Sequence, residues 1–192
     1  MAFFDFLKGV KMMVRVFFYL VSIVAANVLT AAFAPFQLGI FFIPVGTFLI
    51  GATFIIRDLV QNKYGRKKTY FFIVTALVLS AIVSYLLGDS LMIVTASAVS
   101  FIVSETTDTE IYSRLKLPIA WRIFYSGMVG GLLDSALFVV IGLSPIGAGF
   151  LPWEAVPIAI LGQVLAKTLI QALGATLYGL VNQRTKTNVN FS

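Results

Sequence analysis

The chain has no cysteine and no histidine, and only 11% of its 192 residues are charged. Without these two residue types it has no disulfides, no Ser-His or Cys-His catalytic pair, and none of the common side-chain ligands of transition metals. We therefore predict no metal site, no bound cofactor and no catalytic residue, and we expect a function other than that of an enzyme.

The chain is instead rich in long apolar segments: 59% of its residues are hydrophobic and its mean hydropathy is +0.98. A soluble fold of this size cannot hide so much apolar surface. The apolar runs are about 20 residues long, which suits a helix that crosses the hydrocarbon layer. Because they are apolar on every side, we predict an all-α integral membrane protein with six transmembrane helices, near residues 14–34, 36–56, 70–87, 91–112, 121–143 and 155–181.

The basic residues predict how these helices are oriented. Thirteen of the fourteen Lys and Arg residues fall at connections on one side of such a bundle, which the positive-inside rule makes cytoplasmic, together with both termini. We thus expect a cytoplasmic amphipathic segment at 1–13, a transmembrane domain at 14–181 and a cytoplasmic tail at 182–192, in a multi-pass protein of the cytoplasmic membrane. Positive loops are usual in such chains, so the net charge of +6 does not indicate a nucleic-acid partner.

Three charged side chains fall near the middle of predicted spans, or deep inside them: Glu105 in the fourth, Asp134 in the fifth and Lys167 in the sixth. On insertion scales, placing a charge at such a depth costs about a few kcal/mol or more. Each of these side chains must therefore face protein or water. Two interpretations stay open, a set of structural ion pairs or a site for a cationic or donor-rich substrate.

Helical spacing sorts the polar residues of three spans into faces, because positions three and four apart lie on one side of a helix. We expect the acids of span four to look inward, toward the fifth and sixth spans. A G-x-x-x-G pair in span five allows another helix to approach closely, within one chain or between two. The faces hold Phe101, Glu105, Asp108, Thr109 and Tyr112 on span four, Gly127, Gly130, Gly131 and Asp134 on span five, and Gln163, Lys167, Gln171, Gly174 and Tyr178 on span six.

Two further charged stretches flank these faces. Glu110 points away from Glu105 and precedes Arg114 by four residues, which predicts an ion pair at the membrane interface. Arg57 and Asp58 are neighbours at the end of span two, and we expect them to seek different partners. If that end dips inward, Arg57 supplies a second positive charge; otherwise we expect one of the inward acids to carry a proton.

Four segments in order, "FFIPVGTFLIGATFIIRDLVQNKYGRKKT", "SAVSFIVSETTDTEIYSRLK", "GMVGGLLDSALFVVIGL" and "LGQVLAKTLIQAL", resemble the VUT family of vitamin uptake transporters, also called queuosine precursor transporters. The resemblance extends from about residue 27 to about residue 179. It implies a six-helix importer of 7-deazaguanine bases, such as 7-cyano-7-deazaguanine. The family blocks fall on Arg57, Asp58, Ser104, Glu105, Asp108, Asp134, Ser135, Gly162, Gln163 and Lys167.

The chemistry of such a base suits these residues. A guanine-like base offers N1–H and an exocyclic amine side by side, which one carboxylate can accept together, and we assign this role to Glu105 or Asp108. Gln163 or Lys167 would donate to the neighbouring carbonyl, and an aromatic ring would stack on the base. Asp134 is assigned a proton-coupled or charge-balancing role. The remaining candidate substrate-binding residues are Asn27, Arg57, Asp58, Phe101 and Tyr112.

A different class of function stays open, that of the substrate-binding (S) component of an energy-coupling-factor vitamin importer, which needs a separate ATPase module. The small-residue run "AANVLTAAFA" in the first span could dock such a partner helix. The expected partners are thus a small-molecule substrate and the lipid bilayer, with a homodimer or a coupling module left open.

Overall fold

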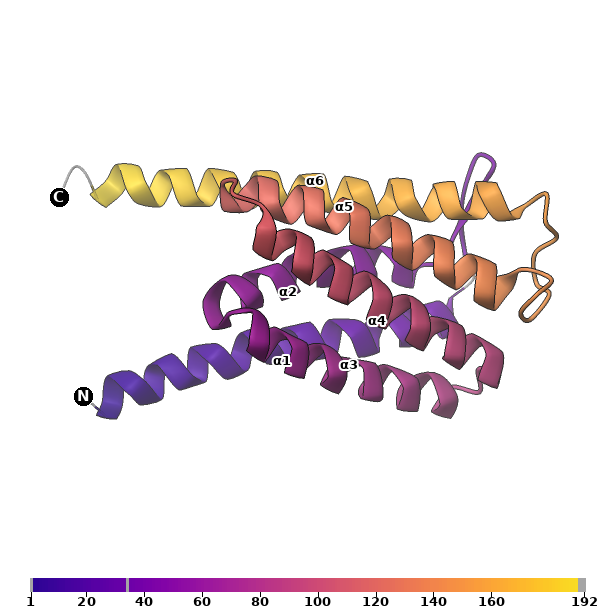
Figure 1. Cartoon of the computed structure of the whole chain (residues 1–192), viewed down its shortest axis with the longest axis horizontal. Coiled ribbons are helices and arrows are strands. Elements are labelled where there is room, and N and C mark those ends of the chain that lie inside the picture. The colour runs from indigo at the N-terminus through magenta and orange to yellow at the C-terminus, as the bar shows by residue number, and fades with distance from the viewer. Residues whose placement is uncertain (1, 34, 190–192) are drawn as a thin grey trace.

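The computed structural model describes residues 2–33 and 35–189, and shows a bundle of helices with one short hairpin (Figure 1). The predicted all-α class is therefore correct in its main feature. The elements are α1 (Ala2–Ala32), β1 (Phe36–Leu38), β2 (Phe41–Ile43), α2 (Gly46–Tyr64), α3 (Arg66–Leu86), α4 (Leu91–Arg114), α5 (Ile119–Leu137), the π-helix η1 (Phe138–Leu143) and α6 (Val156–Val189).

Five segments of the described chain are long and apolar enough to cross a membrane, which makes this a multi-pass membrane protein. They are parts of α1, α3 and α4, the continuous α5–η1 segment and most of α6. The remaining predicted span, the second, corresponds to α2, which is 19 residues long but carries Arg57, Asp58 and Lys63. Its composition alone therefore does not mark it as a membrane helix.

The second predicted span was wrong in its position. We expected one helix over 36–56, but β1 and β2 form an antiparallel hairpin and the helix begins only at Gly46. Gly39 has a φ of 59°, a left-handed conformation that glycine adopts without a steric cost, and it lies in the turn between the strands. A short apolar run cannot by itself be assigned to strand or helix. The consequence is that Arg57 lies seven residues before the end of α2, rather than at a membrane edge.

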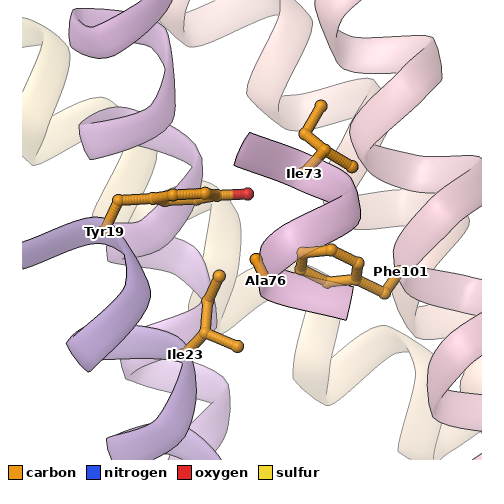
Figure 2. Packing of buried hydrophobic residues seen from close by; sticks show 5 residues of the cluster. All are labelled: Tyr19, Ile23, Ile73, Ala76 and Phe101. Atoms are coloured by element: carbon orange, nitrogen blue, oxygen red, sulfur yellow. The ribbon is translucent and has the colours of Figure 1, made fainter. Parts of the chain in front are cut away.

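The helices pack so that α2 lies between α1 and α6, while α4 contacts both α3 and α5. In Figure 1 the start of α1 and the end of α6 lie at the same end of the bundle, and the hairpin and the 144–155 connection lie at the other. Figure 2 shows one core cluster, in which side chains of α1, α3 and α4 meet: Tyr19, Ile23, Ile73, Ala76 and Phe101.

The outer surface carries apolar side chains, as a lipid-facing surface does. On α6 the exposed residues Leu165, Leu169, Leu173 and Leu177 recur every four positions and form one stripe. The opposite face of the same helix carries Gln163, Lys167 and Gln171, all buried, as the spacing predicted. The bundle therefore buries its polar residues and exposes its apolar ones, which is the reverse of a soluble protein.

The glycines of α5 let neighbouring helices come close. A Cβ atom at Gly127 would meet the side-chain amide of Gln171, and one at Gly131 would touch Lys167, so both glycines face α6. Gly130 faces α2 and α4 in the same way. The close approach predicted from the G-x-x-x-G pair is confirmed, and it occurs within one chain.

Candidate functional site

Arg57 on α2 gathers three carboxylates around its guanidinium. Its Nη2 lies 3.0 Å from Asp58 Oδ1 and also contacts Asp108 Oδ2, and its Nε lies 3.3 Å from Glu105 Oε2. We call Arg57, Asp58, Glu105 and Asp108 the Arg57 cluster. None of the four side chains is more than 1% exposed, so the cluster is enclosed within the bundle.

Neighbouring polar groups hold the Arg57 cluster in place. The Nη1 of Arg57 donates to the hydroxyl of Thr109 and lies 3.4 Å from the side-chain carbonyl of Gln61. From α5, the Ser126 hydroxyl lies 3.3 Å from Asp58 Oδ2 and donates to it. The cluster thus ties α2 to α4 and α5, and a guanidinium with five donors in a planar fork suits this role.

A second ion pair joins α5 to α6. Lys167 Nζ lies 2.7 Å from Asp134 Oδ2 and 2.7 Å from the hydroxyl of Ser135. The Lys167 side chain is 2% exposed and that of Asp134 is 14% exposed, so the carboxylate is the more open of the two. This pair balances its own charge and is separate from the Arg57 cluster.

A cavity of about 150 Å³ opens beside the Lys167–Asp134 pair. Its lining reaches from the buried Lys167 and Phe101 to the exposed Thr30 and Ala31 at the end of α1. The cavity therefore extends toward the end of the bundle that is opposite to the two termini (Figure 1). Other residues of the wall are Asn27, Pro44, Gly46, Thr47, Ser80, Ser84, Asp89, Ser97, Ser100, Phe138 and Gln163.

Polar groups of the cavity wall are partly fixed by hydrogen bonds. The Asn27 amide nitrogen donates to the hydroxyl of Ser80 over 2.8 Å and to its carbonyl over 3.2 Å. The Ser84 hydroxyl donates to a carboxylate oxygen of Asp89. Such bonds orient the amide and the carboxylate, so the cavity presents a defined set of donors and acceptors to a small molecule.

The cavity brings together half of the predicted site residues and leaves out the others. Asn27, Phe101, Asp134, Gln163 and Lys167 all line it. The four residues of the Arg57 cluster do not, and neither does Tyr112, which packs with Ile123 and Ala175.

One alternative about charge partners is confirmed and one expectation was wrong. Arg57 lies inside the bundle and supplies the second positive charge, in contact with Glu105 and Asp108, while Lys167 pairs with Asp134. The expectation that Arg57 and Asp58 seek different partners was wrong, because a long guanidinium can turn back to reach its neighbour while it also binds α4.

Other residues of the predicted faces have structural contacts. The predicted ion pair of Glu110 with Arg114 is confirmed at 3.2 Å, and Arg66 lies equally close to the same carboxylate oxygen. The Gln171 amide donates to the Gly51 carbonyl over 3.0 Å, which links α6 to α2. The contacts of Arg66 and Gln171 join neighbouring helices outside the cavity.

Sequence reasoning missed one wall of the cavity. Asp89, in the connection between α3 and α4, and the serines of the third and fourth spans were not among the predicted site residues. Their spacing was a usable signal: Ser80 and Ser84 lie four apart on α3, and Ser97 and Ser100 lie three apart on α4. Small hydroxyl residues at helical spacing mark faces where helices approach each other or where polar space remains.

Comparison with known proteins gives one result. The profile of a family described as "Putative vitamin uptake transporter" matches residues 83–181, which is half of the chain. The matched region begins at the end of α3 and includes α4, α5 and most of α6, so it contains Asp89, Phe101, Asp134, Gln163 and Lys167. No curated protein and no solved structure matches the chain.

Proposed function

The chain belongs to the family described as putative vitamin uptake transporters, and from this membership we propose that it imports a 7-deazaguanine base, such as 7-cyano-7-deazaguanine, across the cytoplasmic membrane. The proposed topology has six transmembrane helices, α2 and the five long apolar ones, with both termini in the cytoplasm. The proposed role is transport with no catalytic step. The observation that carries the proposal is the cavity beside the Lys167–Asp134 pair.

The position of the cavity supports import. With the termini in the cytoplasm, the end of the bundle that carries the hairpin lies outside. The cavity extends to that end, where Thr30 and Asp89 line it. Its inner part is formed by Lys167 and Phe101, both buried. A base that enters from the outside would thus reach a charged pair and an aromatic ring inside the bundle.

The lining residues offer each contact that a guanine-like base needs. Asp134 presents its carboxylate at the cavity, where it can accept the N1–H and the exocyclic amine together. Lys167 and Gln163 can donate to the adjacent carbonyl. Phe101 can stack on the planar ring. The acceptor role that we first assigned to Glu105 or Asp108 passes to Asp134, with Asp89 as the other acid of the wall, because these are the two acids that line the cavity among the described residues.

The size of the cavity favours a small planar ligand. A cavity of about 150 Å³ is about the size that holds a single aromatic ring, whereas pockets for drug-sized ligands measure about 300–1,000 Å³. A two-ring base requires the walls to yield slightly. Larger vitamins require a much greater rearrangement.

Thermal unfolding of the purified protein with a panel of compounds tests this proposal. The panel contains 7-cyano-7-deazaguanine, guanine, adenine and several larger vitamins. A ligand at about 100 times its Kd stabilises the folded state by about 2.7 kcal/mol, so the deazaguanine should raise Tm by several degrees. The Asp134→Asn variant should lose this shift, and Glu110→Gln, which is far from the cavity, should keep it. A shift with a vitamin and none with the deazaguanine would contradict the proposed substrate.

The alternative function, an S component that depends on an ATPase module, makes a different prediction for the same protein. Part of the small-residue run in α1 is used within the chain, since Ala26 is buried and its carbonyl lies against Gly46 at the start of α2. Liposomes that contain only this chain should take up the labelled base if it is a complete transporter. Binding without uptake would instead favour the S component.

A further inference from the structure

The Arg57 cluster contains more negative than positive charge at a place that solvent does not reach. Its three carboxylates face one guanidinium, so with every group ionised the net charge is one minus three, or −2. The desolvation of an uncompensated charge in the interior of a protein costs roughly several kcal/mol. Binding a proton removes such a charge, and buried carboxyl groups respond in this way when no cation is available.

A second observation, independent of the acids, indicates the same ligand. The side chain of Tyr19 is fully buried and extends from α1 into the interior of the bundle (Figure 2). Its hydroxyl lies beside Glu105 and interacts with that carboxyl. A phenol can donate to an ionised carboxylate and can accept from a protonated carboxyl, so Tyr19 can serve as the hydrogen-bond partner of Glu105 both with and without the proton.

Glu105 is the member of the cluster best placed to exchange the proton. Its contact with Arg57, at 3.3 Å, is longer than those of Asp58 and Asp108. It also follows Phe101 by four residues on α4, so it lies one turn deeper on the same face as a residue of the cavity wall.

We propose that Glu105 is a proton-binding residue whose protonation is coupled to movement of the base through the cavity. This inference rests on the proposed transport function. The carboxylate takes a proton from the cavity side and becomes a neutral acid, which releases its contact with Arg57 and loosens the hold between α2 and α4. Release of the proton toward the other end of the bundle restores the ion pair.

The surroundings of Glu105 favour a proton over a metal cation. Arg57 already occupies the centre of the cluster, and no group of acidic side chains in the described part of the chain is arranged to hold a metal ion. The titratable and charged groups that face Glu105 are Tyr19 from α1, Arg57 and Asp58 from α2, Asp108 on its own helix and Asp134 from α5. The side of α3 in this region is apolar, with Ile73 and Ala76.

Infrared difference spectroscopy on the reconstituted protein, without any substrate, tests proton binding directly. Between neutral and alkaline pH, where exposed carboxyls stay ionised, the wild type should show the carbonyl stretch of a protonated carboxyl, with a shift in D₂O. Glu105→Gln should lose this band, Glu105→Asp should retain it at a shifted position, and Glu110→Gln should leave it unchanged. A wild type without the band, or a folded Glu105→Gln protein with the same band, would overturn the assignment.

Uptake of labelled 7-cyano-7-deazaguanine into proteoliposomes tests the coupling. With one proton per base, an inward gradient of one pH unit should drive up to about tenfold accumulation by the wild type, because one pH unit corresponds to about 1.4 kcal/mol. Glu105→Gln should lose this accumulation but still exchange labelled for unlabelled base. Equal accumulation with and without the gradient would refute coupling. If the wild type exchanges no base while the infrared band still depends on Glu105, the proposed substrate is wrong and the proton site stands.

Discussion

Lys167 Nζ lies 2.7 Å from Asp134 Oδ2, and the two residues reach this contact from different helices, α6 and α5. The lysine is almost fully buried, whereas the carboxylate is 14% exposed and lies in the cavity wall. A ligand in the cavity can therefore contact the free edge of the carboxylate while the ammonium stays in contact with Oδ2. This asymmetry lets one pair serve both the packing of the helices and the recognition of a donor-bearing ring.

Removal of one partner of this pair should destabilise the protein, because the other charge is left buried and unpaired. Breaking a buried ion pair costs about 3–5 kcal/mol, and the partial exposure of Asp134 places Asp134→Asn or Lys167→Met near the lower end. The measurement is the free energy of unfolding in detergent. The double variant Lys167→Met/Asp134→Leu should recover most of this stability and still bind no base. Base binding by the stable double variant would show that the pair is purely structural.

Replacement of Phe101 by leucine should weaken base binding more than it weakens the fold. Leucine keeps most of the apolar volume in the α1–α3–α4 core but removes the aromatic face. Stacking on an aromatic side chain contributes about 1–3 kcal/mol per base, so Kd should rise roughly 5- to 150-fold. Phe71→Leu, at a position that is 70% exposed on α3, is the matched control and should leave Kd unchanged. An unaltered Kd for Phe101→Leu, measured by calorimetry, would remove this ring from the site.

Substitution of Arg57 by lysine should strongly destabilise the protein, although both side chains carry one positive charge. The guanidinium uses separate nitrogens to contact Glu105 and the Asp58–Asp108 pair, and one ammonium cannot reproduce this planar fork. We expect a loss of several kcal/mol of stability, on the scale of about 3–5 kcal/mol for a broken buried pair. Arg66→Lys changes an exposed ion pair with Glu110, and its effect should stay below about 1 kcal/mol. Similar melting temperatures for the two variants would contradict the structural role given to the cluster.

Two glycine-to-alanine substitutions in different helices should have different effects on the free energy of unfolding. A Cβ atom at Gly127 would collide with the amide of Gln171, which donates to the Gly51 carbonyl, so Gly127→Ala should displace that side chain. Overpacking of this kind costs about 1–3 kcal/mol. At Gly179 the nearest atom to a new Cβ, on Ala120, is 3.7 Å away, so Gly179→Ala should be neutral or slightly stabilising. Comparison of the two unfolding midpoints checks the prediction; equal midpoints would contradict it.

The sequence was sufficient to predict the helical class and the buried faces of individual helices. The four-residue spacing of Gln163, Lys167 and Gln171 placed all three on one buried face, and the G-x-x-x-G pair predicted close packing in α5. These features depend on helical periodicity alone, which a sequence displays directly. The Glu110–Arg114 pair was predictable for the same reason.

Features that depend on tertiary contacts were not predictable. Apolar residues on both sides of Gly39 look like the start of a membrane helix, and only the pairing of β1 with β2 shows a hairpin. Because α2 begins later in the sequence than we predicted, Arg57 lies inside the bundle. There it contacts Glu105 and Asp108, the acids that we had assigned to the ligand. The serine-lined wall of the cavity needs α3 and α4 to be placed relative to each other, which no periodicity provides.

The absence of native cysteine allows the most direct test of the cavity as the binding site. Ser97 lines the cavity and is half-buried, while Ile146 is 65% exposed in the connection at the same end of the bundle. Single Ser97→Cys and Ile146→Cys variants are treated with a small water-soluble thiol reagent, with and without 7-cyano-7-deazaguanine. We predict that the base slows modification of the Ser97→Cys protein at least about tenfold, as expected of a site more than nine-tenths occupied, and leaves the Ile146→Cys protein unaffected. Equal modification rates at Ser97→Cys with and without saturating base would contradict the account.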